Sequence, residues 1–151
     1  MSYVNSTLMQ GEHVEHSARL HWIILVMPMG WLIASILFFR ASNTNPSFAL
    51  VGLMLLAVFI YREAIALVRF WTTELAVTTR RVIVKKGLIR RDTIELMHEK
   101  VESLGVSQSI MGRLLNFGTV NVNGTGINRT PVVGVRAPLM FRQNALRLID
   151  S

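Results

Sequence analysis

The sequence predicts an α+β membrane protein in which a two-helix transmembrane hairpin precedes a small antiparallel β-sandwich or partly open barrel capped by a C-terminal helix. Two observations lead to this prediction. The first half carries two long apolar runs, whereas the second half changes to short β-branched runs before one amphipathic helix. Charge divides in the same way: residues 1–71 hold four Arg and no Lys against three Glu, and residues 72–151 hold the other twelve basic residues against six acidic ones.

Composition narrows the classes of function. The sequence pI is about 11.1, and 51% of the residues are apolar. Such basicity is typical of nucleic-acid binding, of anionic-lipid binding, or of positive charge kept on the cytoplasmic side of a membrane protein. The apolar first half favours the two membrane explanations. Because the chain has no Cys, a disulfide framework, a thiolate nucleophile and Cys-ligated zinc are excluded.

Residues 1–18 form a polar leader, which we expect to be cytoplasmic and next to the membrane. Within it, His13 and His16 are three residues apart and would share one face of a helix. A closed metal site would need further ligands, for which the nearby candidates are Glu12, Glu15 and His21. We therefore expect a polar juxtamembrane helix here and no metal site.

A hairpin of two transmembrane helices is predicted over residues 19–71. The first apolar run, 22–39, has eighteen residues without a charge, and as a helix it would be about 27 Å long, which matches a hydrocarbon core. A neighbouring helix would satisfy the backbone groups that Pro28 leaves free. Residues 41–47, ASNTNPS, are rich in turn formers and predict the loop. The second helix, 48–71, would be about 36 Å long.

Arg62 and Glu63 interrupt the second apolar run about 20 Å from its start. The Arg62 side chain can extend to the headgroups. Glu63 has two interpretations: a functional carboxylate that faces the hairpin interior, towards His21 or Arg19, or part of a helix end that emerges into water. Arg62 and Glu63 are therefore the candidate intramembrane charges.

Positive residues near the ends of the spans predict the orientation. The connecting loop has only Arg40 at its edge, whereas the other side of the spans carries Arg19, Arg62, Arg69, Arg80 and Arg81. Since positive residues favour the cytoplasmic side, both termini should be cytoplasmic. The chain would then be a multi-pass membrane protein whose second half follows the second span with essentially no linker.

Residues 72–151 predict six or seven short strands and one helix. Alternation is clearest where Val120 and Val122 face one side of a strand, and Asn123-Gly124 then signals a hairpin turn. The predicted strands are 75–79, 82–86, 88–96, 101–106, 117–123 and 132–136. Pro138 suits the first turn of the final helix, whose apolar face is formed by Phe141, Ala145, Leu148 and Ile149.

A basic hairpin follows the second span. It places six positive residues within twelve positions without a carboxylate: Arg80, Arg81, Lys85, Lys86, Arg90 and Arg91. One interpretation is contact with anionic headgroups, where each Lys or Arg contributes on the order of 1 kcal/mol. The other is retention charge on an ordinary solvated hairpin. Nucleic-acid binding is disfavoured, because no stacking aromatic residue interrupts the basic run.

No catalytic constellation is present in the sequence. His98 is the only His in residues 72–151, and the serines near it lie in no nucleophile motif. The glycines of this half form neither a Walker loop nor a dinucleotide fingerprint. We therefore predict a non-enzymatic protein with no catalytic residues, no metal and no cofactor.

Seven short motifs lie along nearly the whole chain. They are Gly11-Glu12, His21-Trp22, 73–91 (TELAVTTRRVIVKKGLIRR), 99–103 (EKVES), 106–115 (VSQSIMGRLL), 117–120 (FGTV) and 137–142 (APLMFR). As a set they resemble the bacterial pleckstrin-homology-like (bacterial PH) domain proteins that have an N-terminal membrane hairpin. Gln10 departs from the pattern, because relatives often have Pro before the Gly-Glu pair.

The resemblance implies a PH-like fold, with two orthogonally packed antiparallel sheets capped by a C-terminal helix, at the cytoplasmic face of a bacterial inner membrane. It implies no activity. Some relatives form rings or larger oligomers, so self-association is expected. The leading hypothesis is a membrane-tethered interaction or scaffold module that binds a protein partner or another copy. The alternatives are an anionic-lipid-sensing module that uses residues 80–91, and a subunit of an oligomeric transport assembly.

Overall fold

The computed structural model describes Val4, residues 7–87 and residues 92–149, with the backbone alone at 127–129. The chain divides into two compact units. One unit is the helical segment Trp22–Trp71, and the other combines Met1–His21 with Thr72–Ser151. The leader therefore belongs with the second half of the chain.

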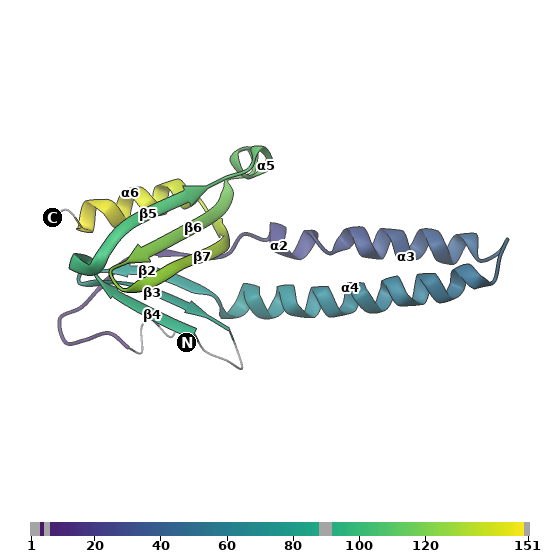
Figure 1. The fold of residues 1–151 in the computed structure, drawn as a ribbon, viewed down its shortest axis with the longest axis horizontal. Coiled ribbons are helices and arrows are strands. Elements are labelled where there is room, and N and C mark those ends of the chain that lie inside the picture. The colour runs from purple at the N-terminus through teal and green to yellow at the C-terminus, as the bar shows by residue number, and fades with distance from the viewer. Residues whose placement is uncertain (1–3, 5–6, 88–91, 150–151) are drawn as a thin grey trace. The chain divides into compact units, whose positions relative to one another are not determined.

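The helical unit contains α2 (Ile23–Val26), α3 (Met29–Ala41) and α4 (Ser47–Thr72) (Figure 1). The first predicted helix is divided at Met27–Pro28, because proline lacks the N–H that would continue the helical bonding. Two apolar segments, Ile23–Ala41 and Ser47–Thr72, are long enough to cross a membrane. Only 11% of each segment's most apolar window is buried within the chain.

Small residues bring α3 and α4 together. The Ser35 hydroxyl is buried and donates a hydrogen bond of 2.8 Å to the carbonyl oxygen of Gly52. A Cβ atom at Gly52 would lie 3.1 Å from the Phe39 ring, so a larger residue there would push the ring away. Near the loop, the rings of Phe38 and Phe48 meet edge to face at 5.8 Å. The sequence prediction of a tight helical hairpin agrees with these contacts.

The first sheet has the order β1-β2-β3-β4 and is antiparallel throughout. Its strands are β1 (Val14–Ala18), β2 (Glu74–Thr78), β3 (Arg81–Lys86) and β4 (Asp92–Met97). The prediction of a helix in the leader is wrong, because β1 pairs with β2 at the edge of this sheet.

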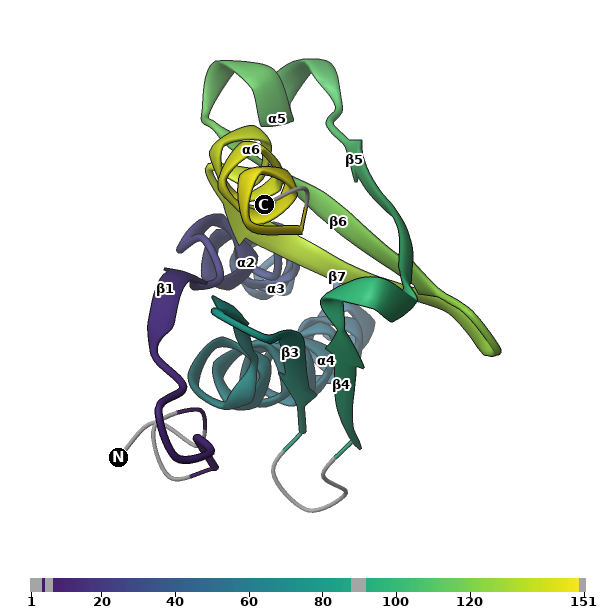
Figure 2. The same cartoon turned by 90° about the vertical axis from the view of Figure 1, so that its left-hand side faces the viewer.

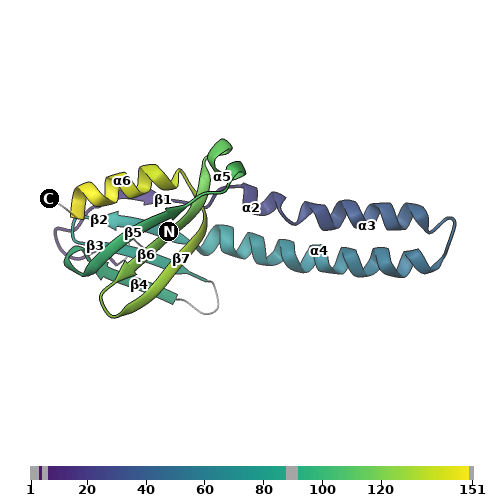
Figure 3. The ribbon, with the colours of Figure 1, turned by 45° about the horizontal axis from the view of Figure 1, so that its top comes forward.

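The second sheet has the order β5-β6-β7, and its strands cross those of the first (Figure 2). It consists of β5 (Val101–Ser107), β6 (Phe117–Gly124) and β7 (Ile127–Arg136). A 3₁₀ turn, η1 (His98–Lys100), joins the two sheets, and a short helix, α5 (Ile110–Leu114), joins β5 to β6. The final helix, α6 (Pro138–Ile149), contacts β5, β1 and β6 (Figure 3).

The core lies between the sheets and under α6. It is formed by alternating β-branched side chains of both sheets and by Phe141 and Ala145 of α6, which are fully buried. Each such aliphatic or aromatic side chain contributes about 1.5–3 kcal/mol by leaving water. The prediction of antiparallel sheets with a C-terminal helix is confirmed. Among the described strands the sheets do not close into a barrel.

The outer face of the first sheet is also covered. Ile83 and Ala76 point away from the main core, yet they are 0% and 1% exposed because Val4 of the leader packs on them. Val14 extends this small cluster. The leader is therefore a strap across the outer face of β2 and β3.

Candidate functional site

Charged residues of β3 and the leader meet on the outer face of the first sheet. Arg81 opens β3, and the alternation of the strand turns its side chain to the same face as Ile83. Its guanidinium donates from Nε to Glu12 Oε1 at 2.9 Å and from Nη2 to Glu12 Oε2 at 2.8 Å. The Glu12 side chain is 0% exposed and the Arg81 side chain 9%. This is a buried, bidentate ion pair between residues 69 positions apart.

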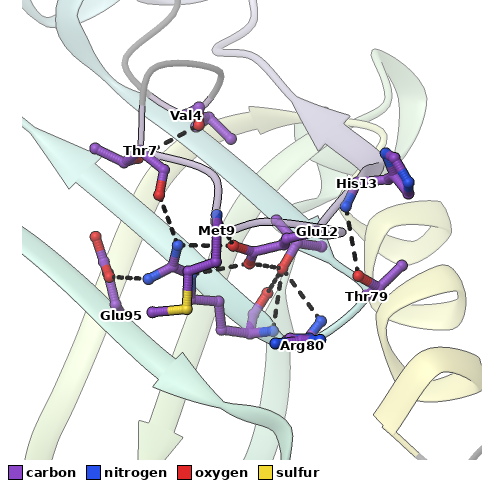
Figure 4. Close-up of polar contacts among 10 residues, drawn as sticks. Val4, Thr7, Met9, Glu12, His13, Thr79, Arg80 and Glu95 are labelled. Carbon is purple, nitrogen blue, oxygen red and sulfur yellow. Dashed lines mark hydrogen bonds and ion pairs between the residues drawn. The ribbon is translucent and has the colours of Figure 1, made fainter.

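Two further acceptors complete the surroundings of Arg81 (Figure 4). Its Nη1 donates to Glu95 Oε2 of β4 at 2.6 Å, and its Nη2 also donates to the Thr7 carbonyl oxygen at 2.8 Å. The guanidinium therefore joins the leader, β3 and β4. Since a buried guanidinium is costly unless its donors are used, these contacts explain why Arg81 can be withdrawn from water.

Glu12 is held by a tight turn of the leader. The Glu12 N–H donates to the Met9 carbonyl oxygen at 2.9 Å, and the Met9 N–H donates to Glu12 Oε2 at 2.8 Å. Gly11 has a φ of +80°, which the third position of a type II turn requires. The Thr78 hydroxyl of β2 donates a hydrogen bond of 2.6 Å to Glu12 Oε1.

The charge state of this pair follows from its contacts. Burial by itself would raise the pKa of Glu12, but hydrogen bonds from Arg81, the Met9 N–H and Thr78, with the positive charge of Arg81, lower it to about 2. The hydrogen bond to Glu12 raises the pKa of Arg81 against the opposing effect of burial, and Glu95 adds to the rise. Both groups are therefore charged at neutral pH.

The four residues of the basic hairpin that the structure describes, Arg80, Arg81, Lys85 and Lys86, do not form one patch. Arg81 is not exposed, as a lipid contact would have to be, because Glu12 and Glu95 enclose its guanidinium. We therefore remove Arg81 from the candidate lipid contacts. Lys85 lies 3.9 Å from Glu74, and Lys86 donates to the Pro131 carbonyl oxygen of β7. Arg90 and Arg91 lie outside the described residues.

The remaining member, Arg80, lies at the opposite end of β3 from Lys85 and Lys86. It is exposed in the β2–β3 turn, and its backbone N–H donates to the Thr78 hydroxyl at 3.3 Å. Because β3 has six residues, its two ends are about 20 Å apart. Because Glu74 pairs with Lys85, the end with the lysines is also where β2 begins. We call this end, which carries Ala18 and Leu75, the entry end, and the end with Arg80 the distal end.

Two basic groups at the entry end have lowered pKa values because they are buried. Burial lowers the pKa of Lys86, and Asp92 opposes this effect. Burial likewise lowers the pKa of His21, with a further contribution from Arg136. The His21 ring lies 5.5 Å from that of Phe117. The ring contact connects the segment that follows the leader to the second sheet.

An open cavity of about 410 Å³ lies at the distal end. Its lining includes Met9, Met97, Arg80 and His98. His98 of η1 is half-buried, and its Nε2 has no hydrogen-bond partner in the part of the chain that the structure describes. The cavity combines apolar thioethers with one exposed guanidinium.

The predicted intramembrane charges differ in exposure. Arg62 is exposed in the middle of α4, whereas Glu63 is half-buried. Its Oε2 atom is buried and lacks a hydrogen-bond partner within the described residues.

The two histidines of the leader do not share a face as a helix would place them. His13 is exposed, whereas His16 packs on Phe141 with ring centroids 5.9 Å apart and lies 3.3 Å from Asn144 through Nδ1. In Val4, 7–87 and 92–149, no three His, Asp or Glu side chains are grouped to hold a metal ion.

Sequence reasoning missed the Glu12–Arg81 pair. Gly11-Glu12 is one of the sequence motifs, and the alternation of β3 places Arg81 on the opposite face from Val82 and Val84, but neither pattern identifies a partner 69 residues away. The usable signal was that an arginine on the same strand face as Ile83 would need an acidic partner if that face were covered.

Two crossed antiparallel sheets, a C-terminal helix and two apolar helices define an α+β protein of the β-sandwich type with a helical hairpin. The family model described as "Bacterial PH domain" matches residues 22–151. The chain therefore belongs to the bacterial PH domain family, as its motifs indicate. No match was found among curated proteins or among solved structures.

Proposed function

We propose that this chain is a membrane-tethered, non-enzymatic interaction module of the bacterial PH domain family, anchored in the inner membrane with both termini in the cytoplasm and self-associating. The observation that carries the proposal is the exposure of the two apolar segments. Their most apolar windows are only 11% buried. A core helix of a soluble protein is mostly buried, whereas a membrane helix presents such side chains to lipid.

The tether is short. Only Thr73 separates the end of α4 from the start of β2. One residue spans at most about 3.6 Å, so a membrane anchor in α4 would keep the entry end of the β domain at the bilayer surface. The module would therefore act on partners at the membrane.

The contacts that the basic residues make within the domain favour protein binding over lipid sensing. Arg81, Lys85 and Lys86 each have a partner inside the domain. The sheet orders leave β1, β4, β5 and β7 as edge strands among the described elements. Edge strands offer backbone groups to which a partner or a second copy can add a strand.

Native mass spectrometry of the full chain, released from its own membranes in mild detergent, tests this proposal. We expect masses that are multiples of 17.0 kDa or that include a bound protein. A monomer with no bound protein under all detergent conditions would contradict the interaction module.

Lipid sensing is the second candidate. Lys85 and Lys86 each have a partner inside the domain, but they lie at the entry end, which the proposed tether keeps at the bilayer surface. The amount of anionic lipid that the protein retains in the same experiment should not change in Arg80→Glu. The distal end lies about 20 Å from the two lysines, and salt screens electrostatic attraction over about 8–10 Å. Loss of bound phosphatidylglycerol in a Lys85→Glu, Lys86→Glu variant, with Arg80→Glu as the matched control, would favour lipid sensing.

The transport hypothesis has one supporting observation, the buried Glu63 Oε2, which has no hydrogen-bond partner among the residues that the structure describes. Two apolar helices per chain could line a path only in an oligomer. The mass measurement therefore bears on this hypothesis as well, because a monomer would exclude it.

A further inference from the structure

The short helix α5 presents apolar side chains to solvent. Ile110 is 86% exposed, Leu114 77% and Met111 57%. These three residues lie within five positions and form a compact apolar projection, which we call the α5 knob. On the surface of a soluble protein, such a group would remain in contact with water, which costs free energy.

The α5 knob is held in this position by its own loop. The Ser109 hydroxyl accepts a hydrogen bond of 3.1 Å from the Gly112 N–H and so caps the helix. The Gln108 side chain donates to the carbonyl oxygens of Gly112 and Phe117 at 3.2 and 3.0 Å. A Cβ atom at Gly112 would lie 2.6 Å from the Phe117 carbonyl oxygen. The exposed apolar residues are therefore part of a built structure.

The α5 knob lies at the entry end of the β domain. Two residues separate the end of α5 from Phe117, the first residue of β6, and the Phe117 ring meets that of His21 at 5.5 Å. The His21 N–H donates to the Gly134 carbonyl oxygen at 2.7 Å, and Leu20 forms an isolated bridge with Val135. The next residue, Trp22, begins the apolar helical segment. Chain connectivity thus brings the knob close to the point where the chain continues into α2.

Positive side chains accompany the α5 knob. Arg113 of α5 is exposed, and so are Arg19 and Arg136, which are joined by a backbone hydrogen bond of 3.0 Å. Apolar side chains beside exposed arginines are the combination that binds at the interface of an anionic bilayer, where the apolar groups enter the acyl boundary and the cations meet the headgroups.

We propose that α5 inserts Ile110, Met111 and Leu114 into the interfacial region of the bilayer and so gives the β domain a third attachment beside its two connections to the helices. This inference rests on the proposed membrane tether. A third attachment beside the two chain connections would restrict the orientation of the β domain on the membrane surface. The distal cavity would then be held facing away from the membrane.

Site-directed spin labelling tests the insertion, because the natural chain has no Cys and each introduced Cys is the single labelling site. The full chain is reconstituted in vesicles of phosphatidylethanolamine and phosphatidylglycerol, and collisions of the nitroxide with oxygen and with a water-soluble nickel chelate are compared. Labels are placed by Leu114→Cys and Ile110→Cys. The control is Met97→Cys at the distal end, whose apolar side chain is also exposed, at 56%.

We expect oxygen collisions to exceed nickel collisions at both α5 positions and the reverse at Met97. Nickel collisions at Leu114 as frequent as those at Met97 would overturn the proposal. Spin–spin broadening between labels at Leu114 would overturn it in favour of an interface between two copies. A label at Ile60 of α4 distinguishes failure of the α5 insertion from failure of the membrane tether. If Ile60→Cys is shielded from nickel while Leu114→Cys is not, the insertion fails and the tether stands; if both are accessible, the tether fails.

Discussion

At the scale of single residues, Arg81 shows how a charge is kept inside a small domain. Withdrawing a guanidinium from water costs several kcal/mol, and a carboxylate offsets this cost only when the geometry is close to ideal. Glu12 meets both Nε and Nη2, and Glu95 takes Nη1. The pair therefore connects the leader strap to β3 and β4, and its loss should loosen all three segments.

Glu12→Gln should lower the free energy of unfolding of the β domain by about 3 kcal/mol, because it leaves a buried guanidinium with one carboxylate in place of two. Hydrogen exchange of the β2 and β3 amides in the full chain measures the loss. Tryptophan fluorescence would not report it, since Trp22, Trp31 and Trp71 all lie in the helical unit.

Lys85→Met is the matched control for Glu12→Gln. Its partner Glu74 is 3.9 Å away and partly exposed, so the change should cost less than about 1 kcal/mol. Equal losses in the two variants would show that burial of the Glu12–Arg81 pair has no special role.

The stability of the β domain should also depend on pH through Glu12. Its pKa is lowered from 4.5 to about 2 in the folded chain, so its contribution is complete above pH 4.5 and is lost as the pH falls towards 2. The full contribution is about 3 kcal/mol. Thermal melting followed by the β-sheet infrared band should show the natural chain and Glu12→Gln converging across this window. Parallel curves would contradict the assignment.

At the scale of elements, the leader turn explains why the departure at Gln10 is tolerated. Gln10 takes the second position of the Met9–Glu12 turn, and Gly11 the third with its positive φ. Proline is favoured at the second position of a type II turn, but the turn forms without it because Gly11 supplies the positive φ.

Gln10→Pro should raise the free energy of unfolding by about 0.5 kcal/mol, because proline restricts the unfolded chain at a position whose φ it can adopt. Gly11→Ala should lower it by about 1 kcal/mol through backbone strain alone, since no atom lies within 4 Å of the added Cβ. Amide exchange in β1 and β2 measures both. A destabilising Gln10→Pro would mean that the turn is of another type.

The close packing of β6 against the end of β5 is a second feature at this scale. A Cβ atom at Gly118 would lie 2.6 Å from Gln108 Cγ and 2.7 Å from the Ser107 carbonyl oxygen. Because the backbone cannot yield readily, Gly118→Ala should cost about 2 kcal/mol. It should also increase amide exchange in α5, which Gln108 holds in place.

Gly105→Ala on the neighbouring strand is the control for Gly118→Ala. The nearest atom to its added Cβ is Asn121 Cβ at 3.6 Å, an ordinary contact. The melting temperature should therefore change little or rise slightly, because alanine loses less backbone entropy on folding than glycine does. A loss as large as that of Gly118→Ala would show that crowding is not the cause.

At the scale of the whole molecule, the proposed topology makes a prediction for labelling in cells. The loop between α3 and α4 should face outwards, and the β6–β7 turn should face the cytoplasm. In the Cys-free chain, Asn45→Cys should react with a membrane-impermeant maleimide in intact cells with an opened outer membrane, whereas Thr125→Cys should react only after the inner membrane is disrupted. The opposite result would reverse the orientation predicted from the positive residues.

The elements that depend on local pattern can be predicted from the amino-acid sequence. The sequence pattern predicts the helical hairpin, six of the strands and α6, because periodic burial and turn residues act over a few positions. Four of these strands lie within one residue of their predicted bounds. β7 begins five residues earlier than predicted, and the predicted start of the strand at 88–96 lies outside the described residues. The sequence pattern does not predict β1, η1 or α5, because β1 lies in a polar segment and η1 and α5 are very short.

The tertiary structure alone decided which charges are free and which are buried. The basic run of residues 80–91 is continuous in sequence, yet β3 turns Arg81 under the leader and separates Arg80 from Lys85 by the length of the strand. Strand alternation is local, but the cover on the outer face comes from Val4 and Glu12, which are about seventy residues earlier. A pattern of neighbours carries no information on such a partner, because burial on both faces of a sheet depends on what the rest of the chain places there.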